Sequence, residues 1–173
     1  MIGCGGRGCA LAMCALLAAC ATPQPQGTDL SGRLSVRIEA HAGMPVQSIS
    51  TQFELRGNAV AGDLRLTTPI GSTAAQASWR PGSAELISAD GARKFAGLDA
   101  LAQDLLGQPL PLAALIDWLR GQPWPGAPNT ASASGFEQLG WRIDLSRFAQ
   151  GWVLAARDLA PSVLVRARLD PPE

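Results

Sequence analysis

The chain has 173 residues and a mass of 18.0 kDa, with 14 basic and 14 acidic side chains, one histidine, four cysteines and no tyrosine. This length suits one domain of ordinary size and is too short for two sizeable ones. Because hydrophobic residues make up 47% of the chain, charged residues 16%, and the formal net charge is zero, the composition excludes a disordered charged tail, a coiled coil and a general electrostatic attraction to nucleic acid.

The first twenty residues contain all four cysteines, and their pattern is typical of an export signal. Arg7 precedes an apolar run over residues 9–19, which is of signal-peptide length and about half of what a bilayer span needs. The run ends in Leu17-Ala18-Ala19-Cys20, which resembles the lipobox of bacterial lipoproteins, where the cysteine becomes the acylated first residue. We therefore predict a signal peptide over residues 1–19 and lipidation of Cys20. The alternative is a plain secretory peptide that happens to contain Cys20.

Lipidation has consequences for location and chemistry. Cleavage before Cys20 leaves that residue as the single thiol, which excludes a catalytic cysteine and a cysteine-rich metal site. Several acyl chains hold a protein on a bilayer, because each buried methylene contributes about 0.8 kcal/mol. In lipoproteins with this kind of box, aspartate after the acylated cysteine accompanies retention at the inner membrane. Ala21 occupies that position here, which favours the outer membrane, with the protein facing the periplasm.

Residues 20–29 are predicted to be the lipidated N-terminus and an extended tether, since residues 22–28 are rich in Pro and Gln and lack an apolar period.

Residues 30–173 are predicted to form one domain in which a period of two dominates. Leu34, Val36 and Ile38 alternate with polar residues and indicate a half-buried strand. Similar patterns predict further strands around residues 49–56, 63–66, 73–79, 84–88, 141–148, 152–156 and 163–169. Gly57-Asn58, Pro81-Gly82 and Asp90-Gly91 fall between such runs, as hairpin turns do, so we expect an antiparallel meander.

The period becomes helical between residues 98 and 121. A first helix has Asp99 as its expected N-cap and Gly107 as its stop. Pro111 begins a second helix, whose apolar residues are the predicted lid: Leu112, Leu115, Ile116, Trp118 and Leu119. Both helices are short and amphipathic, so they are expected to cover the concave face of the sheet. Residues 124–135 lack any period and are expected to be a loop.

Motifs for catalysis and for phosphate binding are absent from the sequence: there is no GxSxG, no P-loop and no GxGxxG between a strand and a helix. His41 has no second histidine to join it and is expected to be a solvated residue of a hairpin loop. Asp99, Asp104 and Asp117 are expected to be cap and surface groups, with a catalytic pair as the alternative. The five tryptophans suit a core or a ligand pocket, and Trp79 is a candidate for lining a cavity. We expect no enzymatic activity, no metal and no cofactor.

Residues 66–73 combine turn chemistry with an apolar tip. Thr68, Pro69 and Gly71 indicate a tight connection between two strands, and Ile70 stands where a turn usually has a polar residue. Exposed apolar tips usually contact another molecule. The alternative is that Ile70 folds back onto the sheet.

The order and spacing of several short motifs resemble the outer-membrane lipoprotein receptor family LolB. These motifs are Gly32-Arg33-Leu34, Phe53-Glu54-Leu55, residues 66–73, Pro81-Gly82, Asp90-Gly91, Leu105-Leu106-Gly107, Pro109-Leu110-Pro111-Leu112, residues 118–123 and residues 138–141. The resemblance covers most of residues 30–145. It implies a mainly β (α+β) fold, an incomplete antiparallel β-barrel with a hydrophobic cavity lidded by short helices.

The same resemblance implies a function. Members of the family accept acylated lipoproteins from the periplasmic carrier LolA and insert them into the inner leaflet of the outer membrane. An apolar residue, commonly Leu, protrudes from their Pro-Leu-Gly loop and is needed for insertion. Pro69-Ile70-Gly71 matches that loop, so Ile70 is the expected insertion residue. We expect a monomer whose partners are the carrier, acylated lipoproteins and outer-membrane lipid.

Three other interpretations compete. A carrier like LolA would share the half-barrel and lack the lipidated Cys20. A lipid-anchored structural or assembly protein of the outer membrane would share the anchor without acyl-chain transfer. An anchored hydrolase would need a nucleophile and base that the sequence does not show.

Overall fold

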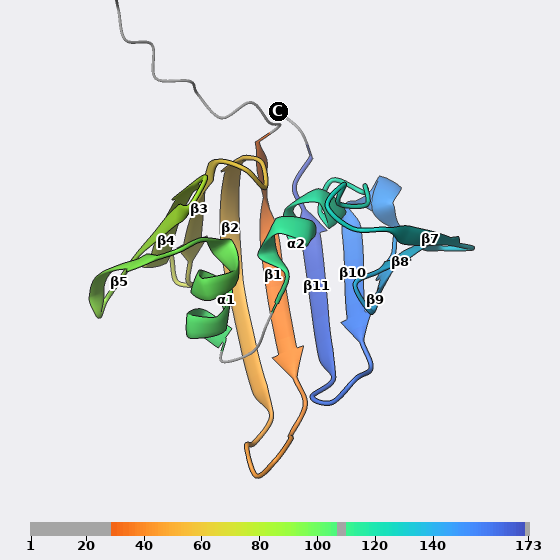
Figure 1. Cartoon of the computed structure of the whole chain (residues 1–173), viewed down its shortest axis with the longest axis horizontal. Helices are drawn as coiled ribbons and strands as arrows, with labels where there is room; N and C mark the ends of the chain where they lie inside the picture. Colours follow the sequence, from red (N-terminus) through yellow and green to blue (C-terminus); the bar gives the residue numbers. More distant parts are fainter. Residues whose placement is uncertain (1–28, 107–109, 172–173) are drawn as a thin grey trace, which may run out of the picture.

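The computed structural model describes residues 29–106 and 110–171, which form one antiparallel sheet of eleven strands (Figure 1). The strands are β1 (Leu30–Ile38), β2 (Gln47–Gly57), β3 (Gly62–Thr67), β4 (Thr73–Arg80), β5 (Ser83–Ser88), β6 (Gly91–Phe95), β7 (Asn129–Ser132), β8 (Gly135–Gln138), β9 (Trp141–Asp144), β10 (Trp152–Arg157) and β11 (Val163–Leu169). Their order across the sheet is β6-β5-β4-β3-β2-β1-β11-β10-β9-β8-β7. The sheet thus has a first arm, β1 to β6, and a second arm, β7 to β11, which meet where β1 pairs with β11. Because β6 and β7 are its two edges, the predicted incomplete barrel is confirmed.

The centre of the sheet shows why the alternating sequence folds this way. Val36 of β1 lies opposite Val165 of β11 and Ile49 of β2. Val36 and Val165 are buried, whereas Arg37, the next residue after Val36, is exposed. Because side chains of a strand point alternately to the two faces, the apolar set lines the concave face and the charged set covers the convex face.

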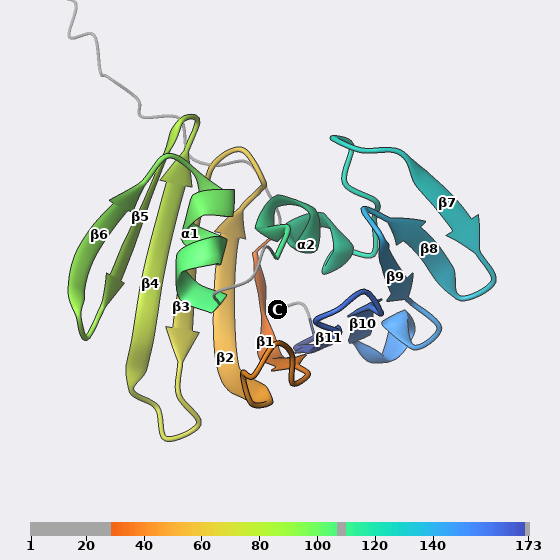
Figure 2. The ribbon, with the colours of Figure 1, turned by 60° about the horizontal axis from the view of Figure 1, so that its bottom comes forward.

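Two helices lie against the concave face. Figure 2 shows α1 (Leu98–Leu106) over the first arm and α2 (Leu112–Trp118) between the two arms. Leu101 and Ala102 of α1 are buried in the same apolar core as the concave residues of the strands. The prediction that the helices cover this face is therefore confirmed. Neither helix is long and apolar enough to cross a bilayer, nor is any other in the described part of the chain.

One stretch predicted to be a loop contains a strand. Within residues 124–135, β7 pairs with β8 along four residue pairs from Asn129 and Gln138 to Ser132 and Gly135. All four residues of β7 are exposed, so neither face is buried and no apolar alternation marks the strand. Pairing with β8 through backbone hydrogen bonds holds it in place.

Two boundaries also differ from the prediction. The strand expected over residues 141–148 ends at Asp144, whose Oδ1 accepts a hydrogen bond of 2.8 Å from the Ser146 amide. A 3-10 helix, η1 (Phe148–Gln150), follows. Asp99 lies inside the first turn of α1, where its charge complements the helix dipole, and is not the N-cap. The predicted stop, Gly107, lies outside the described residues.

A close approach in the first arm yields a testable expectation. A methyl group on Gly62 would overlap the carbonyl oxygen of Arg56 and the ring of Trp79. We expect Gly62→Ala to lower the free energy of unfolding by about 1–3 kcal/mol, as overpacking does, in chemical denaturation. Gly97→Ala is the matched control, because a methyl group there meets nothing within 4 Å. Equal stability of the two variants would contradict this account of the packing.

Candidate functional site

The loop between β3 and β4 holds an apolar side chain in solvent. The Thr68 amide donates to the Ser72 carbonyl at 2.8 Å, and the Gly71 amide donates to the Thr68 carbonyl at 2.9 Å. Gly71 has a φ of 88°, a conformation that glycine adopts without strain. These bonds close the loop at its base, and Ile70 at its tip is 88% exposed. The alternative in which Ile70 folds back onto the sheet is wrong.

The predicted lid residues come together on α2 and at its end. Leu115, Ile116, Trp118 and Leu119 are all at most 6% exposed, and Leu112 is half-buried against the same core. Pro111, predicted to begin the helix, is its N-cap, directly before the first helical residue Leu112, and Leu119 is its C-cap. These side chains are buried in the apolar core between α2 and the concave face.

A buried glutamine fixes α2 to the second arm. Gln138 of β8 is 2% exposed, and its Oε1 accepts from Trp118 Nε1 at 2.8 Å and from the Trp124 amide at 2.9 Å. Its Nε2 donates to the carbonyl oxygens of Trp124 and Ala127, each at 2.7 Å. Trp118 also packs on Trp141 with ring centroids 5.8 Å apart. Gln138 belongs to the motif at residues 138–141, but the sequence predicts no structural role for it, since a lone polar residue at the end of a short strand carries no pattern.

A hydrogen bond from Arg120 joins the C-terminal end of α2 to the first arm. Arg120 donates to the carbonyl oxygens of Gly57, at the end of β2, and of Ile116. Arg120 Nη1 also lies 3.9 Å from Asp117 Oδ1, which makes an ion pair. Burial raises the pKa of the Asp117 carboxyl above its usual value, and the charge of Arg120 offsets part of that shift. Burial likewise lowers the pKa of Arg120. Asp117 and Arg120 therefore serve attachment of the helix.

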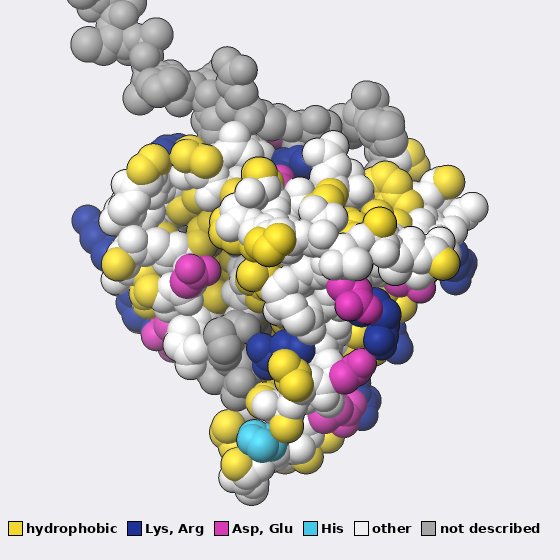
Figure 3. All heavy atoms as spheres, turned by 45° about the vertical axis from the view of Figure 1, so that its right-hand side comes forward, with side chains coloured by type: hydrophobic (Ala, Val, Ile, Leu, Met, Phe, Trp, Pro, Cys, Tyr) yellow, Lys and Arg dark blue, Asp and Glu magenta, His cyan; other side chains and the backbone are white. Residues whose placement is uncertain are grey.

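The remaining titratable candidates also have structural partners or are solvated. Asp104 pairs with Arg93 at 2.6 Å. His41 bonds with Met44 across the hairpin between β1 and β2 through their backbones, and Figure 3 shows hydrophobic side chains around this histidine at the lower tip of the molecule. Among the residues that the structure describes, no group of three or more potential metal ligands gathers. The predicted acyl anchor, Cys20, lies outside the described residues.

Trp79, the predicted cavity residue, lines a groove beside the two helices. The groove has a volume of about 440 Å³, and Val60, Trp79, Leu98 and Ala113 contribute to its lining. Trp79 is 3% exposed and donates through Nε1 to the Asn58 carbonyl at 2.8 Å. The groove thus lies between the two helices and the first arm, with an aromatic ring in its wall.

Comparisons with known proteins agree with this architecture. The family model for the outer membrane lipoprotein LolB matches residues 27–166. The outer-membrane lipoprotein LolB of Bordetella petrii is 37% identical over 177 residues, covering 94% of this chain and 84% of the relative. The protein of that name from Chromobacterium violaceum is 33% identical, covering 80% and 81%, and that from Ralstonia nicotianae is 33% identical, covering 75% and 71%. The chain therefore belongs to the outer-membrane lipoprotein LolB family.

Proposed function

We propose that this outer-membrane lipoprotein accepts acylated lipoproteins from a periplasmic carrier of the LolA type and inserts them into the inner leaflet of the outer membrane. The observation that carries the proposal is the open sheet, whose concave face is apolar and is covered by two short helices. An acyl chain needs such a surface between membranes, because each exposed methylene costs about 0.8 kcal/mol. We propose that the chain itself is anchored through Cys20, which fatty-acid labelling of the wild type and of Cys20→Ala tests.

Acyl chains would bind where α2 now lies. Leu115, Ile116 and Trp118 pack on the concave face, so cargo has to displace the helix or enter beside it. The groove that reaches Trp79 offers an approach between the helices and the first arm. Leu112, Leu115, Ile116, Trp118, Leu119 and Trp79 are therefore the proposed acyl-binding side chains.

The transfer needs no bond breaking and no nucleotide. If the acyl chains bind this protein more tightly than the carrier, differential affinity moves the cargo forward. The bilayer is the deepest apolar sink and then takes the chains up. Ile70, exposed at the tip of its loop, is the proposed contact with the bilayer, together with Pro69 and Gly71, which shape the loop.

A transfer assay tests the proposal directly. The unacylated form from Ala21 to Glu173, which retains every described strand and helix, is incubated with a matched carrier loaded with labelled lipoprotein. We expect the label to move onto this protein. Retention of the label on the carrier, with the protein folded, would contradict transfer and would favour a lipid-anchored structural role.

A further inference from the structure

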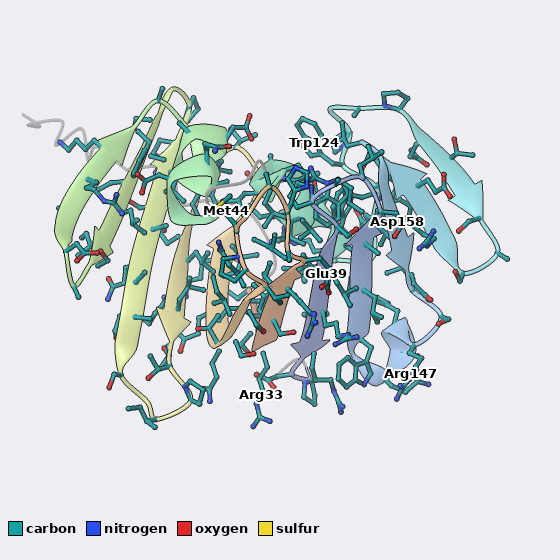
Figure 4. All side chains as sticks on the ribbon, turned by 90° about the horizontal axis from the view of Figure 1, so that it is seen from below. Arg33, Glu39, Met44, Trp124, Arg147 and Asp158 are labelled. Atoms are coloured by element: carbon teal, nitrogen blue, oxygen red, sulfur yellow. The ribbon has the colours of Figure 1, made fainter. Side chains whose placement is uncertain are left out.

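A second groove lies on the convex face, opposite the helices. It has a volume of about 660 Å³, and its walls include Arg33 of β1, Arg166 and Arg168 of β11, Trp152 of β10 and Pro69 of the β3–β4 loop. Figure 4 shows Arg33 and Arg147 on the side of the sheet away from α1 and α2. One groove thus joins an arginine-rich surface to the loop that carries Ile70.

The arginines in this groove form no ion pair with any acidic residue that the structure describes. Arg33 lies directly opposite Arg168 in the pairing of β1 with β11. None of the ion pairs within residues 29–106 and 110–171 involves Arg33, Arg166, Arg168 or the neighbouring Arg147. Like charges placed directly opposite each other on paired strands are destabilising. Because the chain has no net charge, this local excess is not a result of a generally basic composition.

An aromatic side chain organises the cluster. The guanidinium of Arg168 lies 5.3 Å from the ring centroid of Trp152, and that of Arg147 lies 5.6 Å from the same ring. Trp152 is half-buried, so the cluster combines an amphipathic ring with fixed cations. Guanidinium groups bind phosphate through paired hydrogen bonds, and tryptophan with basic residues is typical of surfaces at the membrane interface.

We propose that this groove, defined by Arg33, Arg166, Arg168, Trp152 and Pro69, binds the headgroups of anionic phospholipids at the bilayer surface. The proposal deepens the proposed function and rests on it for the presence of a membrane. Anionic headgroups would supply the counter-charge that none of the described acidic residues provides to these arginines. Since Pro69 lines the groove and Ile70 follows it, docking of the headgroups would place Ile70 at the acyl region of the same bilayer. The groove therefore orients the receptor for delivery.

Vesicle binding by the unacylated form tests this inference. Each basic residue near an anionic surface contributes roughly a fivefold increase in partitioning. We expect Arg33→Gln/Arg166→Gln to bind vesicles containing phosphatidylglycerol about 25-fold less well, and vesicles of phosphatidylcholine alone equally well. The variant keeps the contact of Arg168 with Trp152 and removes a like charge, so its melting temperature should not fall.

Arg65→Gln/Lys94→Gln is the matched control, because it makes the same change in net charge at exposed positions on β3 and β6. It should retain binding to anionic vesicles. Equal losses in the two double variants would overturn the inference, as would a groove variant that binds vesicles normally but no longer binds the carrier protein. The latter result would make the groove a protein-docking site.

Separate measurements test the headgroup groove and the proposed transfer of cargo. Acceptance of labelled cargo from the carrier is measured without vesicles, and the groove variant should accept it like the wild type. Failure of the wild type to accept cargo would contradict the proposed function, while vesicle binding would still decide the role of the groove.

Discussion

Ile70→Glu is expected to accept cargo from the carrier like the wild type and to deliver it to vesicles about 30-fold more slowly. Burying a side chain of this size contributes about 2 kcal/mol, which corresponds to that factor in an equilibrium or a rate. Glu also places a charge where an apolar tip would enter the bilayer. Acceptance should survive, because the loop lies outside the core and its base is closed by its own backbone bonds. Release of labelled lipoprotein into vesicles measures delivery.

Ile87→Glu is the matched control for this prediction. Ile87 is also exposed, at 51%, but belongs to β5, where it lies opposite Gln76 of β4, and is not part of the β3–β4 loop. The Ile87→Glu variant should deliver cargo normally. Ile70→Leu should retain most of the delivery activity, since it keeps an apolar tip. Normal delivery by Ile70→Glu, or equal defects in the two glutamate variants, would remove the insertion role from this loop.

Gln138→Leu is expected to lower the free energy of unfolding by about 3 kcal/mol. Leucine keeps the volume but removes the partner of the Trp118 indole, a side chain with no exposed surface. An unsatisfied buried donor costs about 1–3 kcal/mol, and the backbone groups of Trp124 and Ala127 lose their partner as well. Chemical denaturation measures the loss.

Two comparisons make the prediction specific. Gln76→Leu, at an exposed position on β4, should change stability by about 0.5 kcal/mol or less. Trp118→Phe combined with Gln138→Leu should cost less than the sum of the two single changes, because both remove the same hydrogen bond. Additive losses would mean that the bond between Trp118 and Gln138 does not couple α2 to the second arm.

The elements that could be predicted are those with one buried face. Burial of Val36 and Val165 requires apolar residues at every second position, so the sequence of β1 and β11 reveals both the strand and its inner face. The stripe from Leu112 to Leu119 reveals α2 and its covered side in the same way. Ile70 could be singled out because an apolar residue in a tight turn departs from turn chemistry.

The features that could not be predicted leave no pattern of apolar residues in the local sequence. β7 is exposed on both faces, so its structure comes from pairing with β8, which no local pattern encodes. Gln138 gains its role from Trp118 and Trp124, and these contacts follow from how the chain folds back. The convex groove likewise results from strand register. The pairing of β1 with β11 places Arg33 opposite Arg168, although the two residues lie far apart in the sequence.

The two free edges of the sheet determine how far the space between its two arms can widen. In a closed barrel, the number of strands and their shear fix the radius. Here β6 and β7 are not neighbours, so no ladder of hydrogen bonds sets the separation of the arms. Small changes in twist accumulate across many strands and can widen the space between the arms while every strand pair stays intact. The interior volume of this fold is thus adjustable, so the proposed cargoes, with different numbers of acyl chains, would fit without the breaking of any strand pair.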